Sequence, residues 1–310
     1  MVDGELLTPI DPSILFKVHD PNVERLSDII TQSVDAYQST DIVLVGVPQD
    51  IGVARNNGRV GAALAPDCIR KALYKLAPTH SLSNLKIHDL GNIKVEGELE
   101  EIHERVYTVL RQILTDGKVV VVFGGGNDIS YPDCSALSDL SERVLAFNVD
   151  KHFDARNMEP RNSGTPYRML LEEEKLIPEL FFEVGSEPFA NEPYYVDYLK
   201  RKGVNVVPLA ELRRANLEAW FGKVMGDLSY DSIFWGFDMD SVRASDAPGV
   251  SASYPTGLTA EECLAIAHLA GKNDCSRVFE ITELNPNFDI DNRTCKLAAI
   301  MTFTFMNART

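Results

Sequence analysis

The sequence predicts an α/β fold in three layers, with helices on both faces of a mainly parallel sheet of about eight strands. Short apolar runs rich in Val, Ile and Phe recur along the chain, and longer amphipathic segments separate them. Most of the apolar runs are unbroken, which is typical of parallel strands that are covered on both faces. Regular alternation of strands and helices favours a doubly wound α-β-α arrangement.

Eight runs have the length and composition of strands. They lie at residues 42–47, 85–89, 119–123, 145–149, 180–184, 204–207, 233–237 and 278–282. Amphipathic helices are expected at 98–115 and 260–270. The second of these follows Thr259, and Glu262 stands three residues further on, so the two side chains can form a capping box.

Nothing in the sequence divides the chain. The 310 residues contain no internal repeat, low-complexity tract or linker rich in Pro and Gly, and this length is enough for one large α/β domain. We therefore expect a single domain over residues 1–310, with residues 1–35 as a peripheral N-terminal arm.

Composition argues against several classes of protein. The chain has 30 Lys and Arg against 46 Asp and Glu, a formal net charge of −16, which is unsuited to binding nucleic acid or anionic membranes. No apolar run approaches the roughly 18 residues that cross a bilayer. The five cysteines are scattered without any C-x-x-C pair, so we expect neither a disulfide framework nor a zinc knuckle. These features predict a soluble, cytoplasmic protein.

Six polar side chains follow three of the predicted strands, where each strand ends. They are Asn127 after 119–123, then Asp150, His152 and Asp154 after 145–149, and Asp238 and Asp240 after 233–237. Alternate residues of an extended segment share one face, and ligands collect at the carboxyl ends of parallel strands. We therefore expect these side chains to meet at one edge of the sheet.

Such a group of side chains predicts a pair of metal ions. Four carboxylates repel one another away from water unless cations lie between them. Oxygen ligands with one imidazole suit Mn²⁺. Six ligands are too many for one ion with an open position, but they suit two ions about 3.5–4 Å apart. The charges of four carboxylates and two divalent ions also cancel.

Four segments resemble the signatures of the arginase superfamily, the ureohydrolases. They are GGGN at 124–127, DKHFD at 150–154, GFDMD at 236–240 and ELNP at 283–286, in the same order as the motifs of that family. The resemblance runs from about residue 41 to the C-terminus. It implies an arginase-like fold, two Mn²⁺ ions per chain and hydrolysis by a hydroxide that bridges the ions.

Three further segments resemble the formiminoglutamases within that superfamily. They are DIGVARNNGRVGAALAPDCIR at 50–70, NSGTPYR at 162–168 and APGVSASYPTGLT at 247–259. The resemblance implies cleavage of the C–N bond of N-formimino-L-glutamate to glutamate and formamide, in histidine degradation. A guanidino substrate, as in agmatinases, guanidinobutyrases and arginases, is the alternative.

Individual residues have hypothetical roles in this reaction, and the resemblance implies the role of Glu283. Asp154 would carry a proton to the departing amine, and Glu283 would pair with the amidinium group. Formiminoglutamate presents two carboxylates as well, so its pocket needs positive charge. The substrate-binding side chains that we expect are Arg156, Arg168, Arg59, Ser163 and Glu283. The family's habit further implies a homo-oligomer.

Asn127 departs from the superfamily pattern, which has a metal-binding histidine at this position. One hypothesis is a metal-poor, non-catalytic homologue. The other is that the amide oxygen replaces the imidazole nitrogen as a neutral donor. Because the other five ligands are present, we favour an active enzyme that holds the ion beside Asn127 weakly.

Overall fold

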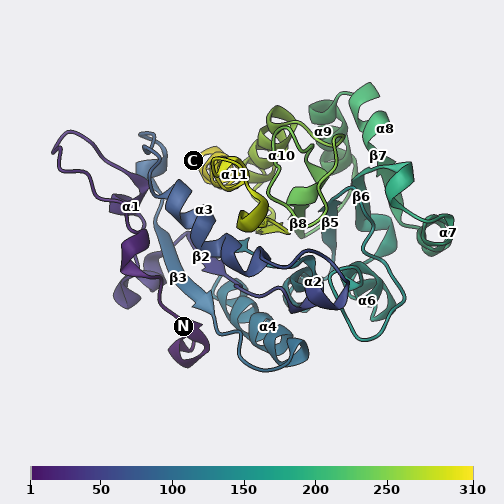
Figure 1. Cartoon of the computed structure of the whole chain (residues 1–310), viewed down its shortest axis with the longest axis horizontal. Helices are drawn as coiled ribbons and strands as arrows, with labels where there is room; N and C mark the ends of the chain where they lie inside the picture. The colour runs from purple at the N-terminus through teal and green to yellow at the C-terminus, as the bar shows by residue number, and fades with distance from the viewer. Residues whose placement is uncertain (1, 310) are drawn as a thin grey trace.

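A computed structural model describes residues 2–309 of the chain. Its nine strands form one sheet in the order β1-β3-β2-β4-β9-β8-β5-β6-β7. Every neighbouring pair is parallel except β1 and β3. Helices cover both faces of this sheet (Figure 1), so the predicted three-layer α/β fold is confirmed.

The strands agree closely with the predicted runs, apart from one addition. They are β1 (Leu7–Thr8), β2 (Ile42–Gly46), β3 (Ile87–Ile93), β4 (Val119–Phe123), β5 (Val144–Val149), β6 (Phe181–Ser186), β7 (Asn205–Pro208), β8 (Ser232–Asp238) and β9 (Ser276–Thr282). Eight of the nine overlap a predicted run. The additional strand is β1, whose two residues are too few to show a periodic pattern.

Eleven α-helices lie among the described residues. They are α1 (Leu26–Ile29), α2 (Ile51–Arg55), α3 (Ala65–Leu73), α4 (Leu99–Thr115), α5 (Ser130–Ser138), α6 (Pro166–Glu172), α7 (Pro193–Lys202), α8 (Leu209–Arg214), α9 (Leu217–Asp227), α10 (Ala260–Lys272) and α11 (Arg293–Ala308). The predicted capping box at α10 forms, since the Glu262 backbone N–H donates to the Thr259 hydroxyl and the Thr259 N–H donates to the Glu262 carboxylate. Within residues 2–309, none of these helices combines the length and the apolar character that crossing a membrane requires.

Part of the segment predicted as a peripheral N-terminal arm, among residues 2–35, packs onto the sheet, and the division into arm and domain stays a prediction. Strand β1 pairs with β3 in antiparallel register. Four apolar side chains of this segment are buried: Ile10 and Ile14 before α1, Leu26 within it and Ile30 directly after it. Burial of four such side chains gives this segment a stabilising contact that a loosely attached arm would lack.

Alternation along the strands divides the core into two clusters, one on each face of the sheet. In β4, Val121 and Phe123 join the cluster that α3, α10 and α11 cover. Val120 and Val122 point to the other face, which α4, α5 and α6 cover. Successive side chains of a strand point to opposite faces, so one apolar run supplies both layers of packing.

One expectation about the cysteines is wrong. Cys68 of α3 and Cys295 of α11 form a disulfide that joins residues 227 positions apart. Cys134, Cys263 and Cys275 are free. Two cysteines so far apart show no sequence spacing that would indicate pairing, because only the fold brings α3 beside α11.

Candidate metal centre

Four neighbouring strands position the predicted site. In the sheet order, β4, β9, β8 and β5 lie side by side. Asn127 follows β4, Glu283 follows β9, and two aspartates stand at the end of β8, with the DKHFD segment after β5. Because these strands are parallel and adjacent, their carboxyl ends meet at one edge, as expected for a ligand site.

The acidic side chains form two overlapping groups. Asp150, His152 and Asp240 offer ligand atoms that all lie within 4.8 Å of one another, and so do Asp150, Asp154 and Asp238. Asp150 belongs to both groups, so it can contact two ions at once. The aspartates in these groups are buried or nearly so. Two cations that share one carboxylate fit this arrangement.

Electrostatics indicates that the cluster needs cations. Burial, together with repulsion from Asp150, raises the pKa of Asp154 to about 7. Burial and the charge of Asp240 likewise raise the pKa of Asp238 well above its usual range. The Oδ2 atom of Asp150 is buried and has no hydrogen-bond partner among the described residues. Hard divalent ions would supply the missing partner and favour the charged carboxylates.

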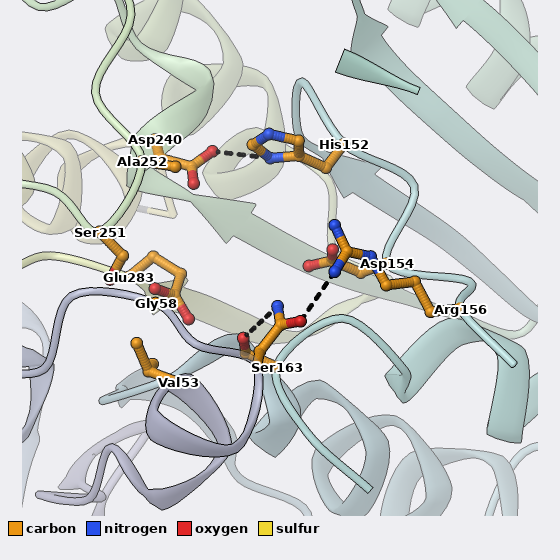
Figure 2. A pocket seen from close by; sticks show the side chains of 11 residues that line it. Val53, Gly58, His152, Asp154, Arg156, Ser163, Asp240, Ser251, Ala252 and Glu283 are labelled. Atoms are coloured by element: carbon orange, nitrogen blue, oxygen red, sulfur yellow. Dashed lines mark hydrogen bonds and ion pairs between the residues drawn. The ribbon is translucent and has the colours of Figure 1, made fainter. Parts of the chain in front are cut away.

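His152 takes part in the same electrostatic balance. Burial alone would lower its pKa, but the nearby charges of Asp240 and Asp150 outweigh that effect and raise the pKa to about 12. Its Nδ1 atom lies 3.3 Å from Asp240 (Figure 2). The same atom lies 3.4 Å from Asp150. In the metal-free cluster these carboxylates favour the protonated form of His152. A bound metal ion would displace that proton, because His152 binds metal as a neutral imidazole.

A cavity of about 180 Å³ opens directly above the acidic cluster. Its wall includes His152, Asp154 and Asp240 of the cluster, together with Arg156, Ser163 and Glu283 (Figure 2). The volume is small, and the polar groups converge on one point. Such a cavity suits a compact polar substrate whose reacting atom lies against the cluster.

Comparison with known proteins identifies the family. A family model described as the arginase family matches residues 40–307. The chain belongs to the arginase family. A protein of Nocardia farcinica named formimidoylglutamase is 32% identical over 281 residues, which are 89% of each chain.

Solved structures of this family superpose closely on the chain. The Trypanosoma cruzi formiminoglutamase with Mn²⁺ matches with a TM-score of 0.87 and 32% identity, over 93% of this chain and 98% of that one. The formimidoylglutamase of Bacillus subtilis matches with a TM-score of 0.86 and 26% identity, over 94% of both chains. Similarity of this extent covers both the sheet and the site.

Asn127 lies at the cluster, but its amide oxygen is turned away. Its Nδ2 atom donates to Asp154 at 2.5 Å. Its Oδ1 atom accepts from the hydroxyls of Ser130, at 3.0 Å, and Thr282, at 2.9 Å. Coordination through the oxygen stays a prediction, and it requires a half-turn of the amide. Hydroxyls can accept as well as donate, so Ser130 and Thr282 can satisfy either orientation.

Arg156 and Ser163 reach the cavity as part of one network. The Arg156 guanidinium donates to Asn56 Oδ1 at 2.8 Å, and Asn56 Nδ2 donates to the Ser163 hydroxyl at 3.1 Å (Figure 2). These contacts fix the guanidinium at the cavity wall. Asn56 was not predicted from the sequence, although it lies within the formiminoglutamase-like segment 50–70.

Two predicted substrate-binding arginines lie elsewhere. The Arg168 guanidinium stacks on the Tyr198 ring, 3.8 Å from its centroid, and pairs with Glu172 at 3.4 Å. Arg168 is not among the residues that line the cavity. Substrate binding by Arg168 stays a prediction that this placement does not support, because its contacts with Tyr198 of α7 and Glu172 of α6 hold the side chain away from the cavity.

Arg59 supports the cavity wall but does not line it. Its guanidinium donates to the backbone carbonyls of Ser251, at 2.9 Å, and Val250, at 2.6 Å, and it lies over the Phe288 ring. With its donors bound to the backbone, Arg59 holds the 250–251 loop in place, whereas direct substrate binding was expected. The loop in turn places Ser251 at the cavity.

Glu283 and Asp154 share an unusual backbone conformation. Their φ angles are +59° and +43°, values that residues other than glycine adopt rarely and mainly at functional sites. Glu283 also accepts the backbone N–H of Asn127 at 2.7 Å, and burial raises its pKa to about 8. The two predicted catalytic carboxylates thus both face the cavity.

Lys151 is a further member of the site that the sequence interpretation missed. Its ammonium is buried, donates to the Asp240 backbone carbonyl at 2.9 Å and lies 4.5 Å from the centroid of the Tyr254 ring. The only feature of the sequence that could have indicated Lys151 was its position inside DKHFD, but a lysine is normally expected to be exposed to solvent. It ties the loop after β5 to the loop after β8.

Proposed function

We propose that this chain is a metal-dependent hydrolase that cleaves N-formimino-L-glutamate to glutamate and formamide, with two Mn²⁺ ions per chain. The observation that carries the proposal is the pair of acidic groups sharing Asp150 directly beneath a cavity that also holds Arg156. Family membership and the relatives named formimidoylglutamase support the same reading.

Each ion would have its own set of side chains. Asp150, Asp154 and Asp238, with Asn127, would hold one ion, and Asp150, His152 and Asp240 would hold the other. When bound, the ions supply the activation of water as a nucleophile near neutral pH. The ion beside Asn127 would be held less tightly, since an amide oxygen is a weaker Mn²⁺ donor than imidazole.

Side chains of the protein would bind the substrate and transfer a proton from the attacking water to the departing amine. The Asp154 carboxylate would take a proton from the attacking water and release it to the departing amine nitrogen. Glu283 would pair with the cationic amidine and so turn its carbon toward the ions. The Arg156 guanidinium, oriented by Asn56, would bind a carboxylate of the substrate.

A paired-substrate assay tests this function. Formimino-L-glutamate and L-arginine are supplied separately to the protein, with and without added Mn²⁺, near pH 8. We expect Mn²⁺-dependent formamide release from the first and little urea from the second. Urea release from arginine at a comparable rate would overturn the substrate assignment. Mn²⁺ binding with neither reaction would overturn the proposed hydrolysis of both substrates.

Hydrolysis of a guanidino substrate is the second candidate function, because the same pair of cations can act on a guanidino carbon as well as on a formimino carbon. Arg156 at the cavity wall favours the formimino compound over agmatine, which carries no carboxylate for it to bind. Arginine and guanidinobutyrate do carry a carboxylate, so only an activity assay separates them from the formimino compound. Replacing Arg156 by Gln should raise KM for formimino-L-glutamate by about tenfold and leave KM for agmatine almost unchanged.

The family's habit supports the proposed assembly, and the composition of the chain supports the proposed location. We propose a single-domain subunit that forms a homo-oligomer and works in the cytoplasm on small molecules, without nucleic-acid or membrane partners. Size-exclusion chromatography with light scattering tests the assembly. A mass of one chain, 34.4 kDa, would contradict it.

A further inference from the structure

A second cavity, remote from the metal centre, lies along α3 and α11. These helices run side by side (Figure 1). The cavity has a volume of about 400 Å³ and shares no lining residue with the cavity at the metal centre. We call it the lysine groove, defined by Cys68, Lys71, Lys75, Lys296 and Ile300.

The lysine groove is positively charged on a strongly acidic protein. Lys71 lies in the last turn of α3, Lys75 lies in the turn that follows this helix, and Lys296 lies on α11. All three are exposed and line the groove. No Asp or Glu is among the residues that line the groove. Three like charges around an apolar floor raise the local concentration of small anions, although the whole chain has a net charge of −16.

Only one of the two cysteines in the Cys68–Cys295 disulfide lines this groove. Cys68 is half-buried and lines the groove, whereas Cys295 is fully buried. An attacking thiolate can therefore reach the sulfur of Cys68 but not that of Cys295. Nearby ammonium groups favour thiolates over thiols, so the lysines assist both the approach and the ionisation of an attacking group.

We propose that the lysine groove is a thiol-exchange site, at which a small thiol that bears carboxylates, of the glutathione class, reduces the Cys68–Cys295 disulfide. The thiolate attacks Sγ of Cys68, the S–S bond breaks, and its electron pair stays on Cys295, which then takes up a proton. A second molecule of the thiol attacks the mixed disulfide and releases Cys68. Two small thiols are thereby oxidised to one disulfide, and both cysteines are reduced.

Reduction would free two helices that support the wall of the metal centre. The loop before α3 and the loop before α11 are held together by Asn285, whose Nδ2 donates to the Arg59 carbonyl at 2.8 Å. Gly58 from the first loop and Glu283 at the start of the second both line the cavity at the metal centre. The disulfide joins α3 to α11, the two helices that follow these loops, and so adds a covalent link to the Asn285 hydrogen bond between the loops.

The test follows the cysteines and does not depend on the reaction that the metal centre catalyses. Full-length protein purified without reductant and loaded with Mn²⁺ is first denatured and alkylated; three free cysteines are expected. The native oxidised protein is then treated with glutathione or with neutral 2-mercaptoethanol, quenched by alkylation and analysed by peptide mass spectrometry. Glutathione should appear on the peptide that contains Cys68.

Charge variants separate the groove from general reactivity. In a triple variant, K71Q/K75Q/K296Q, reduction by glutathione should slow about tenfold, while reduction by 2-mercaptoethanol should keep its rate. A matched variant with K86Q/K200Q/K223Q loses the same charge at exposed lysines elsewhere and should behave as the unmodified protein.

Four results would overturn the proposal. Two concern the cysteines: five alkylatable cysteines in the unreduced protein, or glutathione attached to Cys295. The other two concern the rate of disulfide reduction. In the first triple variant, reduction by glutathione and by 2-mercaptoethanol would slow equally, or reduction by glutathione would slow equally in both triple variants.

Discussion

At the scale of single residues, the metal centre depends on carboxylates that are held where they repel one another. Asp154 lies within reach of Asp150 and Asp238, and it is kept there by a backbone in the left-handed region. The Asn127 amide donates one hydrogen bond to it, which favours its charged form only in part. Burial and repulsion raise its pKa in the metal-free cluster, and bound cations would lower that pKa because they favour the ionised carboxylate.

Replacing Asp154 by Asn removes that proton carrier and keeps the shape of the side chain. We expect kcat/KM for the hydrolysis to fall about 10²- to 10⁴-fold, with weaker Mn²⁺ binding at the position beside Asn127. Steady-state kinetics and metal analysis check this. Asp197→Asn, an exposed change on α7, serves as the control, and kinetics equal to that control would contradict the role of Asp154.

Single residues also mark the limit of inference from sequence. The positions of Asp150, His152 and Asp238 follow from their place directly after strands, which the sequence reveals. The sequence does not reveal where the Arg168 side chain points or which acceptors Arg59 binds. Both depend on neighbours distant in sequence, Tyr198 for Arg168 and the 250–251 loop for Arg59. The orientation of the Asn127 amide likewise depends on Thr282.

At the scale of elements, the site exists because β4, β9, β8 and β5 are neighbours in the sheet. The sequence predicts each of these strands from its apolar run. It does not predict their order, since β9 follows β4 by more than 150 residues and pairing between such segments is set by the packing of the whole domain. The expectation that their ends meet came from a general rule instead: ligands collect at the carboxyl ends of the strands in a parallel sheet.

Helix α3 is attached to the sheet by a buried ion pair. The Arg70 guanidinium is fully buried and donates to both carboxylate oxygens of Asp89 in β3, at 2.8 and 2.9 Å. It also donates to the side chain of Asn92 at 2.6 Å. Nothing in the amphipathic pattern of α3 distinguishes this arginine from an exposed one.

The change Arg70→Met should lower the free energy of unfolding by about 3–5 kcal/mol, because it leaves the Asp89 charge buried without a partner. Urea unfolding followed by circular dichroism measures this. Arg111→Met on the exposed side of α4 is the matched control, with an expected change below about 0.5 kcal/mol. A similar small effect for Arg70→Met would show that the pair contributes little.

At the scale of the whole molecule, cation binding and folding are linked. In the metal-free protein the pKa of Asp154 is about 7, against an ordinary value of 3.8, so the folded state binds more protons than the unfolded state between these values. Stability contributed by this group is complete below its unfolded pKa and is lost as the pH rises through about 7. Cations restore it, because they favour the ionised carboxylates.

The stabilisation that Mn²⁺ provides should therefore depend on pH. We expect saturating Mn²⁺ to raise the melting temperature more at about pH 8 than at about pH 6, since protons compete with metal for the same carboxylates. Thermal unfolding with and without Mn²⁺ at both pH values gives the comparison, and Ca²⁺ is a control for a general effect of divalent charge. A shift that is larger at the lower pH would contradict the assignment of these carboxylates as ligands.

The claim that paired cations hold these acids together is tested most directly by the number of Mn²⁺ ions bound per chain. Elemental mass spectrometry after equilibrium dialysis near pH 8 gives this number. The unmodified protein should bind two ions, and Asp150→Ala should bind almost none while keeping its circular dichroism spectrum, because Asp150 belongs to both groups of ligands. An unmodified protein that binds no Mn²⁺, or an Asp150→Ala variant that still binds two ions, would contradict the claim that paired cations hold these acids together.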